Sequence, residues 1–128
     1  MHVLYKAEKR KKNATIILKR ATVFFNDLAA HLSDIDEDLG LFAYDRAGLG
    51  KSGPSTSKRT ADQMVKELKA LLAAADVKPP YLFVAHSFGA VIARLFASRY
   101  SDEVIGMVLL DPACEDQEEK CCRYFRTH

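Results

Sequence analysis

The sequence has few cysteines, no long hydrophobic run and little net charge. Its three cysteines, Cys114, Cys121 and Cys122, are odd in number and lie near the C-terminus, which argues against a disulfide-rich fold. No apolar run reaches the roughly 18 residues that a membrane-spanning helix needs. The net charge of +2 is too small to indicate binding to nucleic acid or to a membrane. Residues 1–12 are polar and lack the apolar core of a signal peptide, so we expect a cytoplasmic protein.

The 128 residues suit one small domain, which we divide into three segments. Residues 1–13 are expected to form a basic extension, in which Lys9–Lys12 is either a solvated chain start or a basic targeting or nucleic-acid patch. Residues 14–113 form the core. Residues 114–128 form a charged tail whose cysteines, taken with His128, match no familiar zinc spacing. We therefore expect reduced thiols, and neither a metal nor an organic cofactor.

Hydrophobic patterns predict strands that alternate with helices. A helix is expected after Thr60, with Gln63 completing a capping box, and others over 24–32 (with His31 exposed) and 88–100. This alternation predicts right-handed crossovers and a mostly parallel sheet in a three-layer α/β/α sandwich. The expected strands are short, apolar and rich in branched residues, as buried parallel strands are: Ala14–Leu18, Leu41–Tyr44, Tyr81–Ala85 and Val104–Leu110.

The sequence Ala85-His86-Ser87-Phe88-Gly89 lies where the third of these strands meets the following helix. A serine on such a tight strand–turn–helix elbow needs small residues two positions before and two after it, and Ala85 and Gly89 satisfy that need. The strained backbone of the turn would project the Ser87 hydroxyl beyond the strand end. The Phe88 N–H would be an oxyanion donor beside the positive end of the helix. The competing interpretation is that Ser87 only caps the helix.

Three segments resemble the α/β-hydrolase superfamily of esterase- and lipase-like serine hydrolases. The segment Phe42–Gly53 (Phe-Ala-Tyr-Asp-Arg-Ala-Gly-Leu-Gly-Lys-Ser-Gly) is similar to the loop after the family's fourth strand. Residues 81–100 resemble its elbow strand and helix, and Met107–Pro112 resembles its sixth strand. The resemblance covers about residues 14–116. It implies strands in the order 4-3-5-6, with the elbow where the winding of the sheet reverses and α/β folds place their ligands.

The resemblance implies hydrolysis of a small ester-like substrate through Ser87, assisted by an acid and a histidine. Both partners normally follow the sixth strand, and the stretch after Pro112 is too short for the strands that carry them. We therefore expect a partial fold with impaired catalysis. Asp111 is a candidate acid, although it is also a plain polar stop before Pro112. His128 and His86 are weak candidates for the base, since strand alternation turns His86 away from the serine.

The second oxyanion donor is also in question. In relatives a glycine-containing turn after the third strand supplies it, whereas this chain has Leu18-Lys19-Arg20-Ala21-Thr22 there. Glycine lets a backbone N–H approach the substrate closely, and bulky cations would alter that approach.

Two other functions stay open at this point. Gly50-Lys51-Ser52 ends like a phosphate-binding P-loop, but the glycine required five residues earlier is Asp45, and Gly53-Pro54 interrupts the helix that should begin there. The other is a non-catalytic fragment or interaction module, whose bare sheet edges could drive self-association.

Overall fold

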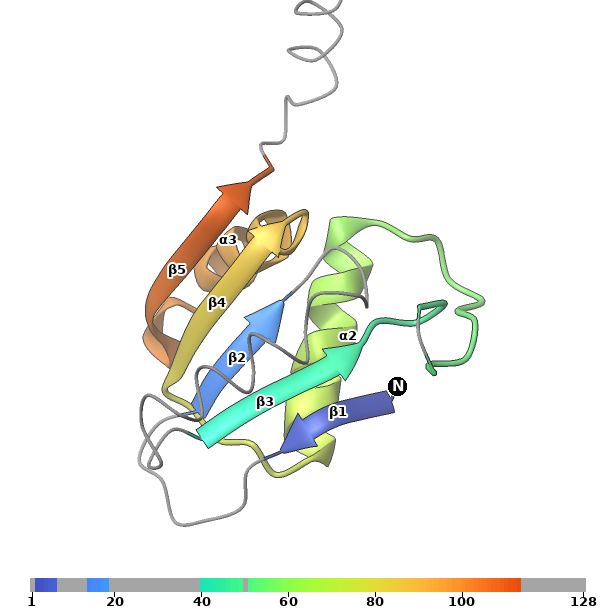
Figure 1. The fold of residues 1–128 in the computed structure, drawn as a ribbon, viewed down its shortest axis with the longest axis horizontal. Helices are drawn as coiled ribbons and strands as arrows, with labels where there is room; N and C mark the ends of the chain where they lie inside the picture. Colours follow the sequence, from blue (N-terminus) through green and yellow to red (C-terminus); the bar gives the residue numbers. More distant parts are fainter. Residues whose placement is uncertain (1, 7–13, 19–39, 50, 114–128) are drawn as a thin grey trace, which may run out of the picture.

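The computed structural model describes residues 2–6, 14–18, 40–49 and 51–113. Its strands alternate with helices after the first two strands, as Figure 1 shows. In chain order the elements are β1 His2–Lys6, β2 Ala14–Leu18, β3 Gly40–Asp45, α2 Ala61–Ala74, β4 Tyr81–Ser87, α3 Gly89–Arg99, the 3₁₀ turn η2 Ser101–Glu103 and β5 Val104–Pro112.

The strands form one sheet of five in the order β1-β3-β2-β4-β5 (Figure 1). β2 pairs in parallel with β3 and β4, and β4 pairs in parallel with β5. This is the predicted order of four parallel strands. β1 adds a strand that the sequence patterns did not predict: it lies antiparallel to β3, in a segment that we expected to be only a basic extension.

Three strands run further than predicted: β3 gains one residue at each end, and the extensions of β4 and β5 lie at the elbow. β4 continues to Ser87 and β5 continues to Pro112. The pairing of His86 with Leu110 is followed by that of Ser87 with Pro112, so Asp111 is the extra residue of a β-bulge. Asp111 was expected to stop β5. Instead it bulges, and Pro112 is tolerated because β5 lies at the edge of the sheet.

The ends of α2 are set by local hydrogen bonds. Thr60 caps the first turn, where its hydroxyl accepts from the Gln63 N–H at 3.1 Å. The predicted capping box is only half formed, because the Gln63 side chain donates to Glu67 instead of accepting from Thr60. At the other end the N–H groups of Asp76 and Val77 close a Schellman motif, and Asp76 takes the left-handed φ of 54°.

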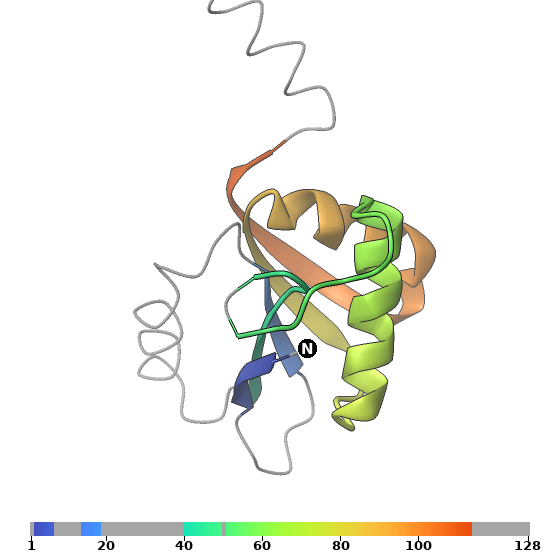
Figure 2. The same cartoon turned by 90° about the vertical axis from the view of Figure 1, so that its right-hand side faces the viewer.

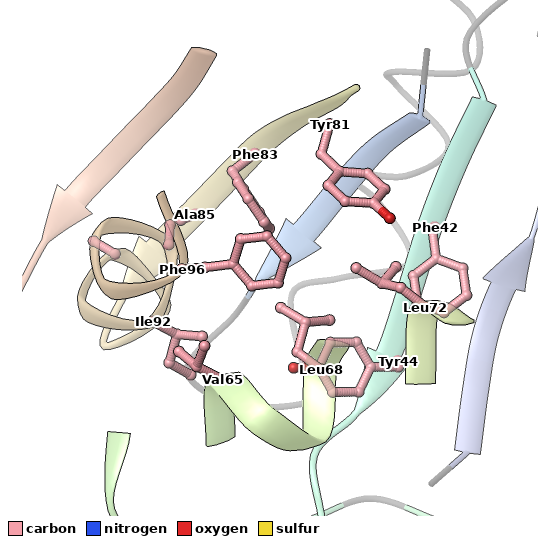
Figure 3. Close-up of a cluster of buried hydrophobic side chains, with 12 residues drawn as sticks. Phe42, Tyr44, Val65, Leu68, Leu72, Tyr81, Phe83, Ala85, Ile92 and Phe96 are labelled. Carbon is pink, nitrogen blue, oxygen red and sulfur yellow. The ribbon is translucent and has the colours of Figure 1, made fainter. Parts of the chain in front are cut away.

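Both described helices pack on the same face of the sheet, and Figure 2 shows them on one side of the strands. Alternate residues of β4 face this layer, and Phe83 lies 5.1 Å from Phe96 between ring centroids in an edge-on arrangement (Figure 3). The α2 stripe Val65, Leu68 and Leu72 is fully buried against them. The core therefore lies directly beneath the β4–α3 corner and supports it.

Several expectations concern residues outside the described ranges. These are the helix over 24–32 with His31, the turn over 19–22, and the tail 114–128. Neither described helix has the length and apolar character to span a bilayer.

Candidate functional site

The corner between β4 and α3 holds Ser87 in an unusual backbone conformation. β4 ends at Ser87, Phe88 makes the turn, and α3 begins at Gly89. Ser87 has a φ of 53°, a left-handed value that residues other than glycine rarely adopt. Ala85 and Gly89, the small residues on either side of Ser87, are both buried. The left-handed backbone lies at the residue for which the sequence predicts a strained turn, and the role of Ser87 as a nucleophile stays a prediction.

The start of α3 bears on the competing interpretation of Ser87 as a helix cap. The N-cap residue is Phe88, with φ −62° and ψ −24°, and it makes no side-chain capping hydrogen bond. Its carbonyl accepts from the Val91 N–H at 3.0 Å and opens the helix. Ser87 therefore precedes the cap, and its side chain is only partly exposed at the carboxyl end of β4. Free N–H groups of the first helical turn favour negative charge at this end.

Asp111 lies at the same end of the sheet as Ser87, on the neighbouring strand. Its bulge gives it a φ of 43°, and its side chain is exposed. Just beyond it, the Ala113 N–H donates to the Ser87 carbonyl at 3.0 Å. The structure thus brings the candidate nucleophile and the candidate acid to adjoining strand ends, where Ser87 pairs with Pro112 and the left-handed Asp111 is the residue before Pro112.

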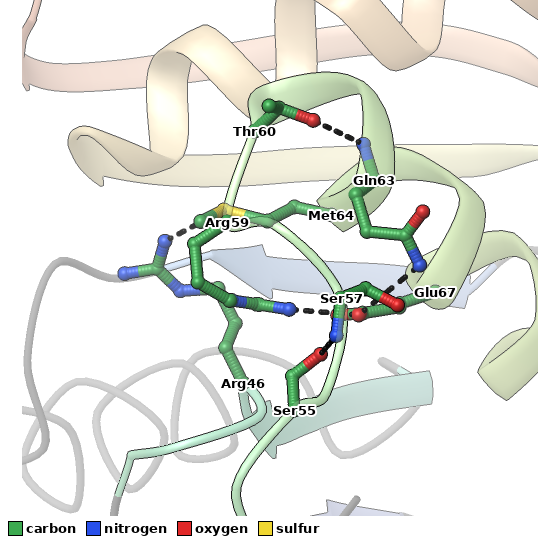
Figure 4. A network of polar contacts seen from close by, with 8 residues as sticks. All are labelled: Arg46, Ser55, Ser57, Arg59, Thr60, Gln63, Met64 and Glu67. Atoms are coloured by element: carbon green, nitrogen blue, oxygen red, sulfur yellow. Dashed lines mark hydrogen bonds and ion pairs between the residues drawn. The ribbon is translucent and has the colours of Figure 1, made fainter.

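Arg46 is a residue near the corner that sequence reasoning did not single out. Its guanidinium lies 5.4 Å from the centre of the Phe88 ring and donates to the Met64 sulfur at 3.4 Å (Figure 4). Burial lowers the pKa of Arg46, but a guanidinium keeps its charge in proteins. The Arg–Phe stack is a cation–π contact that ties the loop after β3 to the residue after Ser87. Arg46 lies in the segment 42–53 that resembles the family, but the sequence alone did not show that it contacts Phe88.

Buried beside Arg46 is the Tyr44 hydroxyl, which has no hydrogen-bond partner in the described part of the chain. Burial raises the pKa of Tyr44 far above its ordinary value, so the phenol stays neutral. The same loop reaches α2 through Arg59, which pairs with Glu67 at 2.7 Å (Figure 4). These contacts hold the loop after β3 against the helix layer.

Of the other candidate catalytic and metal-binding residues, the structure describes only His86. His86 is exposed on β4, one position before Ser87. His128, the three cysteines and the turn 19–22 lie outside the described ranges. Within those ranges no group of three His, Cys, Asp or Glu side chains could hold a metal ion.

The P-loop interpretation meets an obstacle in the loop after β3. A P-loop needs a helix directly after its Lys-Ser pair. Among residues 51–60 there are only turns and irregular backbone, and the next helix starts at Ala61. The structure therefore does not supply the helix N-terminus that would bind a phosphate after Lys51 and Ser52.

Comparison with known proteins identifies the family. Residues 19–127 match the family described as serine aminopeptidase, S33. The chain belongs to this α/β-hydrolase family. The uncharacterized protein YqjL of Bacillus subtilis is 65% identical over 85 residues, which make up 66% of this chain and 34% of YqjL. The chain therefore spans about a third of the length of that relative.

Solved structures of α/β-hydrolases have the same fold. The chain aligns with an α/β-hydrolase from Novosphingobium aromaticivorans at a TM-score of 0.73 and 21% identity, covering 94% of this chain and 43% of the other. It aligns with a carboxylesterase structure from Nitrososphaera gargenis at a TM-score of 0.75 and 17% identity, covering 92% and 44%. The arrangement of β2 to β5 with α2 and α3 is therefore that of an α/β-hydrolase sheet.

Proposed function

We propose that the protein hydrolyses an ester or a related acyl bond through a covalent acyl-Ser87 intermediate. One observation carries the proposal: Ser87 is left-handed between a buried strand and a helix. Such backbone strain costs about 1–3 kcal/mol and clusters at active sites and ligand-binding turns. Membership of the S33 family supports the same chemistry.

The reaction would take two steps. The Ser87 oxygen attacks the carbonyl carbon while its proton passes to a base, and the protonated leaving group departs. Water then attacks the acyl-serine, the carboxylic acid leaves, and the hydroxyl is restored. Negative charge develops on the carbonyl oxygen in both steps, and the Phe88 N–H would stabilise it.

The substrate class proposed is a small molecule with an ester or similar acyl bond. The family description names serine aminopeptidases, and a structural neighbour is a carboxylesterase. Both cleave carbonyl–heteroatom bonds, so an activated ester and an aminoacyl anilide are suitable first probes. The cytoplasmic location also stays a proposal, which cell fractionation would test.

We further propose that this chain by itself turns over substrate slowly. A serine hydroxyl without a base is a weak nucleophile. His86 is adjacent to Ser87 on β4, and strand alternation directs its side chain away from the serine. Asp111 could orient an imidazole, but a carboxylate acting alone would not provide the complete triad.

Labelling by a fluorophosphonate tests the role of Ser87. We expect the parent chain and Ser98→Ala to be labelled equally, because Ser98 is an exposed serine on α3. Ser87→Ala should lose the label. Equal labelling of Ser87→Ala and the parent would remove Ser87 from the chemistry.

Added imidazole tests whether a base is lacking. Hydrolysis of p-nitrophenyl acetate by the parent should be slow and should rise with imidazole concentration beyond the increase measured with Ser87→Ala. Ser87-dependent turnover that is fast without imidazole would show that the chain already supplies its own base.

A second function, binding without catalysis, is favoured by the edge of the sheet. In the described part of the chain β5 pairs only with β4, and Ile105, Val108 and Leu110 are 57%, 47% and 40% exposed. Residues 105–110 of this edge carry no charge, and uncharged edges tend to pair with other strands, so we propose self-association through β5. Sedimentation should show a concentration-dependent dimer that Val108→Lys abolishes. A parent chain that stays monomeric at every concentration contradicts this function.

A further inference from the structure

The inference concerns Arg94, on the buried side of the β4–α3 corner. Its guanidinium, through Nη1, donates to the Ala113 carbonyl at 2.9 Å. The Ala113 N–H in turn donates to the Ser87 carbonyl at 3.0 Å. Two consecutive hydrogen bonds therefore connect α3, the chain leaving β5, and the backbone of Ser87.

We infer that Arg94 is a positioning residue, which holds the Ser87 turn in place by anchoring Ala113. The inference rests on the proposed role of Ser87 as nucleophile and adds a residue that controls its geometry. The role inferred for Arg94 is to hold the turn and not to take part in the reaction. It acts through the backbone of the neighbouring strand.

The strain at the corner explains why an anchor is needed. Ser87 and Asp111 have φ values of 53° and 43°, and such conformations persist only where the surrounding structure enforces them. The strand pairing shifts register between His86 and Ser87, so the pair of Ser87 with Pro112 is separated by this break from the regular ladder below it. The bond from Ala113 lies just beyond the irregularity, and it bears directly on the Ser87 carbonyl.

The anchor is itself well placed to be rigid. Ala113 is only 7% exposed, and Arg94 is partly buried on α3, seven residues after Ser87. A hydrogen bond from a charged donor is about twice as strong as one between neutral groups, more so away from water. Loss of the guanidinium would remove the hydrogen bond to the Ala113 carbonyl and weaken the bond from the Ala113 N–H to the Ser87 carbonyl.

The test compares Arg94→Met, Arg94→Lys and the control Arg99→Met. Arg99 lies on the same helix but pairs with Asp62 on α2. The readout is the rate constant of fluorophosphonate labelling, measured below the unfolding transition of each variant. We expect a loss of about tenfold or more for Arg94→Met, since a displacement of about 1 Å can cost ~100-fold. Lysine, which can still donate to the carbonyl, should recover most of the rate, and Arg99→Met should match the parent.

A purely structural role predicts a different result. It would lower the urea midpoint of Arg94→Met and leave the labelling rate of the folded protein unchanged, and that result overturns the inference. So would a failure of lysine to recover the rate.

Amide hydrogen exchange separates this inference from the proposed function. The Ala113 amide should lose protection at least about tenfold in Arg94→Met, while Phe83 in the middle of β4 keeps its protection. A parent chain that is not labelled even with added imidazole ends the proposed function, and the exchange result then decides whether Arg94 holds the turn. Unchanged protection of Ala113 overturns the inference, whatever the labelling shows.

Discussion

At Ser87 we predict that glycine stabilises the protein relative to alanine, the reverse of the usual effect of glycine on stability. In a regular helix or strand, replacing alanine by glycine destabilises a protein. At residue 87 the φ of 53° lies where a Cβ atom clashes with its own backbone. We therefore expect Ser87→Gly to be more stable than Ser87→Ala. Comparing these two variants removes any contribution of the hydroxyl.

The magnitude follows from two opposing terms. A left-handed residue with a Cβ costs about 1–2 kcal/mol, which glycine avoids. Glycine loses about 0.5–1 kcal/mol because its unfolded chain is more flexible. The net gain at residue 87 is therefore about 0.5–1 kcal/mol. A matched control is Ala70→Gly on the exposed face of α2, which should lose about 1 kcal/mol.

The assay is urea unfolding followed by far-ultraviolet circular dichroism, since the chain contains no tryptophan to report by fluorescence. The quantity compared is the difference in unfolding free energy between the glycine and alanine forms at each position. The two positions should differ in sign. If glycine destabilises residue 87 as much as residue 70, Ser87 is not strained and the argument for the elbow fails.

Two further predictions concern hydroxyl and carboxylate groups outside the corner. Tyr44→Phe should be neutral or stabilising, because it removes a buried hydroxyl without a partner among the described residues. Tyr81→Phe breaks a 2.9 Å hydrogen bond to a backbone carbonyl and should lower the free energy of unfolding by about 1 kcal/mol. Urea unfolding that ranks the two variants in the reverse order contradicts this prediction. Hydrogen bonds from Lys66 and Arg99 hold the pKa of Asp62 below its ordinary 3.8, so its contribution to stability is present above pH 3.8 and is lost as the pH falls through the lowered value. Stability measured against pH should therefore converge for the parent and Asp62→Asn in acid, and a gap that persists there would exclude the effect.

Local pattern was enough to predict most of the sheet. The strands β2 to β5 consist largely of apolar runs, a pattern typical of parallel strands that stands out in the sequence. β1 was missed because it lies beside a basic run and pairs antiparallel to β3, its one partner in the described part of the chain. The capping box was half right because Glu67, one turn further along α2, competes for the Gln63 side chain.

The elbow could be predicted because its requirements are local. Small residues on both sides of Ser87, a strand before it and a helix after it are all visible in the sequence. Arg46 and Arg94 were not, because their partners lie 18 and 19 residues away in contacts that depend on the folded arrangement. No spacing rule connects an arginine on α3 with a carbonyl beyond β5.

Arg46 and Arg94 both form contacts close to the strained turn at Ser87. The strained turn at Ser87 sits above a core that is fully buried at Phe83, Ala85 and Phe96, so the strand and helix flanking it are fixed by packing. Packing alone does not choose the left-handed backbone, since a relaxed turn could join the same elements with less strain. Arg46 contacts the ring of Phe88, the residue after Ser87, and Arg94 donates to Ala113, whose N–H is bonded to the Ser87 carbonyl. The apolar core thus supports the flanking elements, Arg46 contacts the turn at Phe88, and Arg94, by our inference, acts on the turn through Ala113.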